Sequence, residues 1–212
     1  RDENEHLDYG QRVADTFHLS DFFVRIEGHD DRLKQSLWRI LDLLFGNPYV
    51  TPSFDEYAMF MAFVASLRSA DLSRQVGAVV AVDGQVVATG ANDTPKAGGG
   101  QYWPVADKLP QEVHFPEDGR DFALGHDSNK IEQLKIIDDI LDRAEKAGLD
   151  RSKLQQTLDD SRIRDLTEFG RVVHAEMEAL LSCARARIPT RNGTLYATTF
   201  PCHNCAKHIV DA

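Results

Sequence analysis

Apolar residues recur at helical spacing in the first third of this 212-residue chain. Residues 33–44 carry leucines and isoleucines three or four positions apart, which predicts an amphipathic helix, and Gly46-Asn47-Pro48 predicts its end. A second helix is predicted to follow the capping box Ser53-Phe-Asp-Glu56, with Met and aromatic side chains over residues 59–67 as its apolar face. Such a stripe is more often core packing than a ligand site.

The pattern then changes to short apolar runs that are typical of strands. Residues 76–82 and 85–91 are almost entirely small and apolar, and Asp83-Gly84 between them favours a two-residue hairpin turn. Because apolar residues fill both faces of each run, we expect helices to cover the sheet on both sides. The two runs are therefore predicted to be central strands of a helix-flanked sheet.

A long insertion is predicted between this hairpin and the next core helix. Residues 94–128 are rich in Gly, Pro and Asp, which is typical of a lid, a binding loop or a disordered segment. The capping box Asn129-x-x-Glu132 then predicts a helix that Gly148 ends, and a second helix is predicted from about Ser152. The whole insertion, 94–165, could shape a pocket or an oligomer contact.

Composition narrows the class of protein. The formal net charge is −10, which argues against a nucleic-acid partner but leaves room for a nucleotide, since a nucleotide needs only a few local cations. No apolar run reaches the roughly 20 residues that cross a bilayer, so no membrane contact is expected. Three cysteines, two of them in a metal motif, predict a reducing compartment and hence a cytoplasmic protein.

Two short motifs carry the chemistry. His174-Ala175-Glu176 and Pro201-Cys202-His203-Asn204-Cys205 together offer one imidazole and two thiolates, a donor set that suits Zn²⁺. Three protein ligands leave a fourth position for water, as in catalytic zinc sites, and bound zinc lowers the pKa of that water towards about 7. Glu176 is not needed as a ligand and is predicted to move protons.

The cysteine pair has other interpretations when it is taken alone. Cys202-x-x-Cys205 could be a redox pair or half of a structural zinc site. No second pair exists to complete a four-cysteine site, and Cys183 lies in an apolar helical stretch where packing is expected. Pro201 predicts that the pair opens a helix, where the dipole favours thiolates. We therefore expect two helix starts, at His174 and at Cys202, to face one metal ion.

Both motifs resemble those of the cytidine deaminase superfamily. His174–Leu180 and Phe200–Lys207 are most similar to the deoxycytidylate deaminase branch. The N-terminal stretch and Asp165–Val173 are similar to the deaminase half of bacterial anti-phage deoxycytidylate deaminases, two-part proteins with a P-loop kinase-like domain ahead of the deaminase. The resemblance implies hydrolytic deamination of dCMP or dCTP, which would drain a nucleotide pool during phage infection.

The resemblance also implies the fold. It predicts a three-layer α/β/α architecture with a mixed central sheet and a helical insertion before the zinc helix. Residues 51–212 would form the deaminase domain, with two further strands of the family sheet expected after residue 212 and missing from this chain. Residues 1–50 would be a helical N-terminal extension, either a cap on the core or a connector from an upstream P-loop domain. A homo-oligomer is expected, as in related deaminases.

Substrate-binding residues follow from the same resemblance. Asn92 matches the Asn that binds the sugar hydroxyl, and the backbone around Ala175 and Thr199 would contact the edge of the base. Ser73, in the turn before the first strand, is predicted to join them. A phosphate near the zinc would also need cations. The candidates are Lys96, Arg162, Arg164 and Arg171.

Two alternatives remain open. A polynucleotide cytosine deaminase would act on single-stranded DNA or RNA, and the acidic composition and the lack of an aromatic and basic stripe weigh against it. A zinc-stapled regulatory domain without turnover would have no use for Glu176.

Overall fold

The computed structural model describes residues 20, 22–24, 30–103, 119–159 and 161–212. It divides the chain into two units, Arg1–Ser53 and Phe54–Ala212. In the first unit, helix α2 (Asp30–Leu44) confirms the amphipathic helix that the sequence predicts. Its first turn carries Asp30 and Asp31, whose charges favour a helix start, and Gly46 ends it with a left-handed φ of 70°. Most of the predicted N-terminal stretch before α2 lies outside the described residues.

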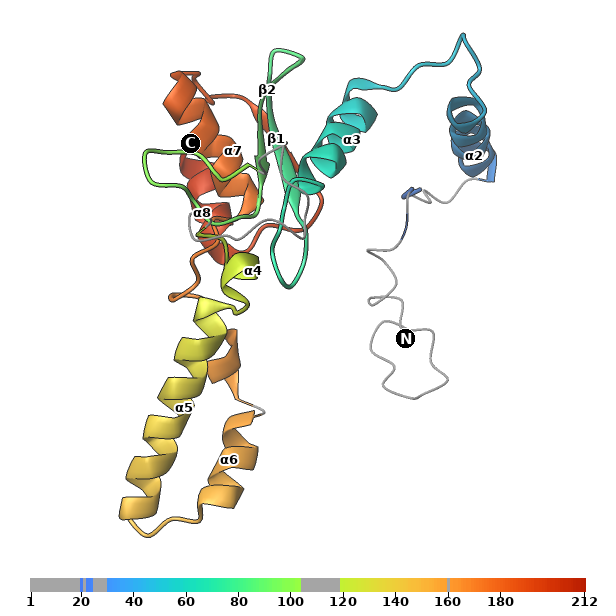
Figure 1. The fold of residues 1–212 in the computed structure, drawn as a ribbon. Coiled ribbons are helices and arrows are strands. Elements are labelled where there is room, and N and C mark those ends of the chain that lie inside the picture. The colour runs from blue at the N-terminus through green and yellow to red at the C-terminus, as the bar shows by residue number, and fades with distance from the viewer. Residues whose placement is uncertain (1–19, 21, 25–29, 104–118, 160) are drawn as a thin grey trace. The chain divides into compact units, whose positions relative to one another are not determined.

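Three antiparallel strands form the sheet of the second unit (Figure 1). Strands β1 (Gly77–Val82) and β2 (Gln85–Ala91) make the predicted hairpin, with Asp83 and Gly84 both at positive φ in the turn. Strand β3 (Thr194–Ala197) pairs with the other side of β1, so the order is β2-β1-β3. The prediction that both hairpin strands are central is wrong for β2, which lies at the edge of this sheet. The described strands contain no parallel pair.

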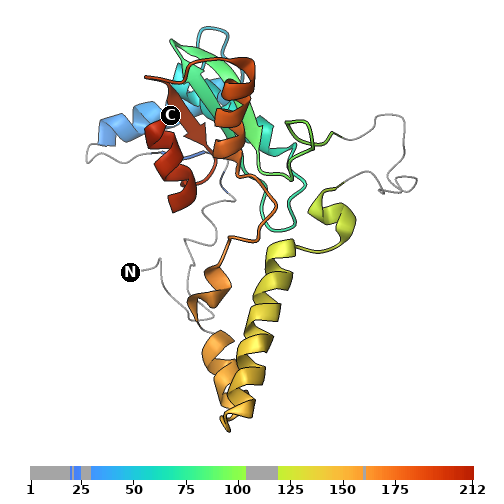
Figure 2. The same cartoon turned by 90° about the vertical axis from the view of Figure 1, so that its left-hand side faces the viewer.

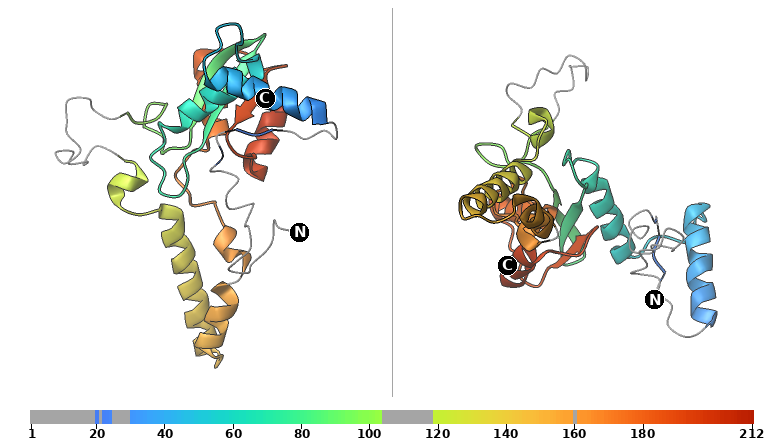
Figure 3. Two further views of the ribbon diagram at one scale, coloured as in Figure 1. Left: turned by 90° about the vertical axis from the view of Figure 1, so that its right-hand side faces the viewer. Right: turned by 90° about the horizontal axis from the view of Figure 1, so that it is seen from below.

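Helices cover both faces of the sheet, which gives three layers (Figures 1 and 3). Helix α3 (Phe54–Ser66) packs on one face, where Ala58 and Ala62 enclose Val79 of β1. Helix α7 (Ala175–Ala186) packs on the other face against Ala78 and Val80, the neighbours of Val79 on β1. Because successive strand residues point to opposite faces, the apolar run of β1 serves both helices at once.

The predicted insertion forms a helical arm between β2 and α7 (Figure 2). It consists of α4 (Asp121–Leu124), α5 (Ser128–Lys146), α6 (Arg151–Asp159) and the 3-10 helix η2 (Arg162–Asp165). The capping residue of α5 is Asp127, whose carboxylate accepts bonds from Asn129 N and Lys130 N. The predicted cap at Asn129 is therefore wrong by two positions. Residues 104–118 of the predicted loop lie outside the described residues.

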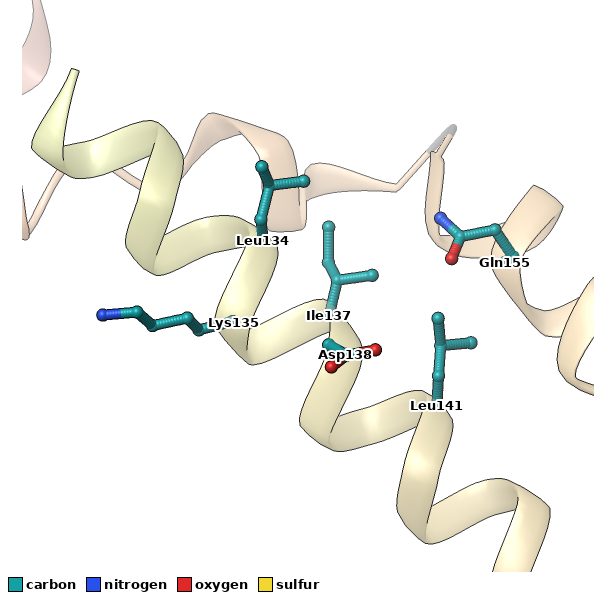
Figure 4. Close-up of a pocket in the computed structure, with 6 residues that line it drawn as sticks. All are labelled: Leu134, Lys135, Ile137, Asp138, Leu141 and Gln155. Carbon is teal, nitrogen blue, oxygen red and sulfur yellow. The ribbon is translucent and has the colours of Figure 1, made fainter. Parts of the chain in front are cut away.

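A groove between α5 and α6 is lined by side chains of ordinary helix packing (Figure 4). Leu134, Ile137 and Leu141 form its apolar wall, and Lys135 points away from it. Ile137 and Leu141 are buried, so this wall is the small core of the helical arm. The groove brings together no imidazole or thiol. None of the described helices is long and apolar enough to cross a membrane.

Candidate metal centre

Two helix starts converge on one point in the second unit. His174 is the residue before the first turn of α7, and Cys202 is the residue before the first turn of α8 (His203–Asp211). Both have extended backbone, with ψ of 150° at His174 and 166° at Cys202, and neither side chain caps its own helix. The imidazole and the thiol are therefore left for a ligand at the positive end of two helix dipoles.

The three predicted ligands lie at coordination distance of one another. Nδ1 of His174 is 3.4 Å from Sγ of Cys202 and 3.4 Å from Sγ of Cys205, and all ligand atoms of the three lie within 4.8 Å. Tetrahedral bonds of about 2.1 Å to nitrogen and 2.3 Å to sulfur place such atoms roughly 3.6 Å apart. The cysteines are not joined in a disulfide. The donor set and its spacing fit Zn²⁺.

The surroundings of Cys205 also suit a cation. Burial raises the pKa of the Cys205 thiol, and the nearby Glu176 carboxylate and Cys202 thiol raise that pKa further. Cys205 is only 1% exposed and Glu176 only 2% exposed. A buried thiolate beside a carboxylate is costly unless a positive charge compensates both. A divalent ion held by these ligands supplies that charge and favours the thiolate.

A pocket opens beside the three ligands and brings the predicted substrate-binding residues together. Its lining comes from the turn before β1, the end of β2, the start of α7 and the β3–α8 connection. The lining residues are Asp71, Ser73, Arg74, Val76, Asn92, Val172, His174, Ala175, Glu176, Thr199, Phe200 and Cys202. Asn92, Ala175, Thr199 and Ser73, which the sequence places far apart, therefore share one pocket with Glu176.

Asn92 also has a structural task that the sequence did not reveal. Its Oδ1 accepts a hydrogen bond from Val76 N at 2.6 Å, and its Nδ2 donates one to Arg74 O at 2.7 Å. Asn92, which directly follows β2, thus holds the turn that leads into β1. An amide nitrogen carries two N–H groups, and these contacts use one of them.

Asp71 organises the same turn. Its Oδ1 accepts bonds from Ser73 N at 2.8 Å, from Ser73 Oγ at 2.6 Å and from Arg74 N at 3.1 Å. This Asx-type arrangement holds Ser73 and Arg74 at the pocket. The sequence offered a signal for it, an Asp followed by Ser two residues later, but not its position beside the metal ligands.

The cations proposed from the sequence do not gather at this pocket. Arg171 donates to Asp121 Oδ1 at 3.0 Å and to Gly119 O at 2.6 Å, and so it anchors the start of α4. Lys96 and Arg162 do not line the pocket, and the side chain of Arg164 lies outside the described residues. Arg74, which does line it, was not among the predicted cations.

Two glycines set how closely the helices approach the sheet. A Cβ at Gly90 would lie 2.2 Å from Ala175 O and 2.5 Å from Ala179 N, both backbone atoms of the helix that carries Glu176. A Cβ at Gly77 would meet the backbone of α3 on the opposite face just as closely, at 1.9 Å from Ala62 O. Backbone contacts this short leave no room for a side chain.

Gly90→Ala is expected to displace the first turn of α7 and to weaken metal binding, whereas Gly77→Ala displaces α3. Overpacking of this kind costs about 1–3 kcal/mol of folding free energy, so both variants should be destabilised. Denaturant unfolding measures that loss, and zinc content per folded chain measures the second effect. Zinc should fall in Gly90→Ala more than in Gly77→Ala at matched stability. Equal zinc content in the two would contradict a positioning role for Gly90.

Comparisons with known proteins agree with this centre. The family model of the cytidine and deoxycytidylate deaminase zinc-binding region matches residues 52–212. The deoxycytidylate deaminase of Schizosaccharomyces pombe is 42% identical over 71 residues, covering 32% of this chain and 22% of that protein. The deoxycytidylate deaminase of Saccharomyces cerevisiae is 28% identical over 163 residues, covering 77% of this chain and 36% of that protein.

A bacterial protein and a solved structure are also similar to this chain. ComE operon protein 2 of Bacillus subtilis is 43% identical over 42 residues, covering 20% of this chain and 22% of that protein. The matches thus span between 22% and 36% of the length of these curated relatives. A dCMP deaminase of cyanophage S-TIM5, solved in complex with dCMP and dUMP, aligns with a TM-score of 0.40 and 20% identity over 77% of each chain.

The family model covers well over half of the chain and includes both zinc motifs. His174, Cys202 and Cys205 are positioned to bind the metal for which that region is described. The chain therefore belongs to the zinc-binding cytidine and deoxycytidylate deaminase family.

Proposed function

We propose that this protein hydrolyses the exocyclic amine of a deoxycytidine nucleotide, releasing ammonia and the deoxyuridine nucleotide. One observation carries the proposal: the buried Glu176 carboxylate lines the same pocket as His174 and Cys202 of the metal donor set. A purely structural zinc site has no need of a buried acid that is not a ligand. The names of the yeast relatives support deoxycytidylate as the kind of substrate.

Glu176 is the proton carrier in this proposal. His174, Cys202 and Cys205 would hold a zinc ion, which would supply a water molecule with its pKa lowered towards about 7. Glu176 would take one proton from the water that adds to C4 of cytosine and pass it to N3, then take the second proton from the added hydroxyl and pass it to the leaving amine. Both protons of the water would thus end on the products, as the C4–N bond breaks and ammonia leaves. Its place in the first turn of α7 keeps the carboxylate within two residues of the ligand His174.

The remaining pocket residues orient the substrate. The backbone at Ala175 and Thr199 would contact the edge of the base, and the second N–H of Asn92 would reach the sugar hydroxyl. Ser73 donates its hydroxyl hydrogen to Asp71, so its oxygen would accept from the substrate. All four residues line the pocket, which supports this assignment.

The biological setting is also proposed. Resemblance of the N-terminal stretch and of residues 165–173 to anti-phage deaminases supports depletion of dCMP or dCTP during infection. Residues 1–50 would connect to an upstream P-loop domain and residues 51–212 would be the deaminase domain, as the family match from residue 52 supports. We also propose a cytoplasmic homo-oligomer.

A substrate panel tests the proposal. Full-length protein loaded with zinc is incubated with deoxycytidine, cytidine, dCMP, dCTP and a cytosine-containing single-stranded oligonucleotide, and uracil product and ammonia are measured. We expect turnover of dCMP or dCTP and none of the oligonucleotide. Turnover of the oligonucleotide alone would establish a polynucleotide deaminase, and turnover of nothing would establish a zinc-stapled domain.

A further inference from the structure

We infer that Arg74 binds the 5′-phosphate of the substrate and so makes this site select nucleotides over nucleosides. The inference rests on the proposed deaminase function and adds a specificity-determining residue to it.

The charge of the pocket singles out this side chain. Among the described residues that line the pocket, Arg74 is the only Lys or Arg, and Asp71 and Glu176 are its carboxylates. Glu176 lies at the metal-ligand end, beside Cys205. Arg74 comes instead from the turn before β1. The Glu176 carboxylate and the Arg74 guanidinium are therefore carried by different elements of the pocket. A phosphate needs such a cation if it is to enter a pocket that contains two acids.

Hydrogen bonds hold the backbone of Arg74, while its side chain has no partner among the residues that the structure describes. Its N–H donates to Asp71 Oδ1 at 3.1 Å, and its carbonyl oxygen accepts from Asn92 Nδ2 at 2.7 Å. The residue itself is exposed, and its guanidinium makes no ion pair or hydrogen bond with any described residue. A planar guanidinium donates two parallel bonds to phosphate oxygens, and no residue in the described part of the chain competes for them.

Among the described contacts, the Asp71 carboxylate makes no ion pair with the Arg74 guanidinium. Asp71 Oδ1 already accepts three hydrogen bonds from Ser73 and Arg74 backbone and side-chain groups, and these hold its carboxylate to the turn. Asn92 lies between the expected positions of the base and the phosphate. Its side-chain amide donates to Arg74 O and also lies where the sugar is expected. Base, sugar and phosphate would therefore meet α7, Asn92 and Arg74 in that order.

Arg74→Gln is expected to lower the ratio of kcat/KM for dCMP to that for deoxycytidine by about 10- to 100-fold, since charge-assisted hydrogen bonds to the phosphate are lost. Arg74→Lys keeps the positive charge but cannot donate two parallel hydrogen bonds, so it should recover part of the preference for dCMP over deoxycytidine. Lys96→Gln is the matched control, because it removes one positive charge outside the pocket, and its ratio should stay that of the unaltered protein.

A binding measurement separates this inference from the proposed function. Calorimetry of zinc-loaded full-length protein with dUMP and with deoxyuridine should show that Arg74→Gln weakens dUMP binding about 10-fold or more and changes deoxyuridine binding far less. Equal losses for both ligands, or no loss for either, would overturn the role of Arg74. Failure of the unaltered protein to deaminate any nucleotide, with dUMP binding still dependent on Arg74, would instead overturn the proposed reaction.

Discussion

Cys205→Ala is expected to lose bound zinc and all turnover, whereas Cys183→Ala keeps both. The two cysteines form a matched pair, because both thiols are almost fully buried, at 1% and 0% exposure. Cys205 Sγ lies 3.4 Å from Nδ1 of His174, while Cys183 packs in the apolar core of the α7 face. Removing one of three protein ligands leaves His174 and Cys202 too few donors to retain the ion against a chelator.

The direct measurement is the number of zinc ions per chain after dialysis against a weak chelator. Thermal unfolding checks that each variant is folded. We expect about one zinc per chain in the unaltered protein and in Cys183→Ala, and close to none in Cys205→Ala. Both variants lose a buried thiol and leave a small cavity in its place, so the free energy of unfolding should fall modestly in both. Full zinc occupancy in Cys205→Ala would refute the three-ligand centre.

The metal centre could be predicted from the sequence because its donors are encoded in two short motifs. Each motif lies at a helix start that nearby residues indicate: Pro201 directly precedes Cys202, the N-cap of α8, and the apolar residues from Ala175 onward predict α7. The Asp83-Gly84 hairpin was predictable for the same reason, since two adjacent residues determine the turn. These features depend on neighbours along the chain.

Features that depend on distant partners were missed. The edge position of β2 follows from the pairing of β1 with β3, more than a hundred residues later, and an apolar run shows burial but not strand order. Arg74 enters the pocket because Asn92, 18 residues further on, holds its carbonyl. Both Asp127 and Asn129 can cap a helix, but the side chain of Asn129 instead donates to Leu166 O at 2.7 Å, 37 residues further on, and Asp127 is the cap.

Glu176→Gln is expected to keep zinc and to lower kcat by roughly 10²- to 10⁴-fold, the range typical of a positioned proton carrier. The amide matches the carboxylate in shape but cannot take up a proton from water. Glu176 makes no protein ion pair that would hold α7 in place among the described residues, so folding should change little. Zinc content, unfolding and single-turnover ammonia release together separate chemistry from folding.

Glu178→Gln is the matched control for that experiment. Glu178 lies two residues along the same helix and is also buried, at 5% exposure, but its carboxylate pairs with Arg185 and does not line the pocket. Its loss should therefore lower stability, by about 1–3 kcal/mol for a charged hydrogen-bonded partner, and leave turnover per folded chain nearly unchanged. Turnover by Glu176→Gln at the rate of Glu178→Gln would show that the acid beside the metal moves no proton, and the proposed proton carrier would be wrong.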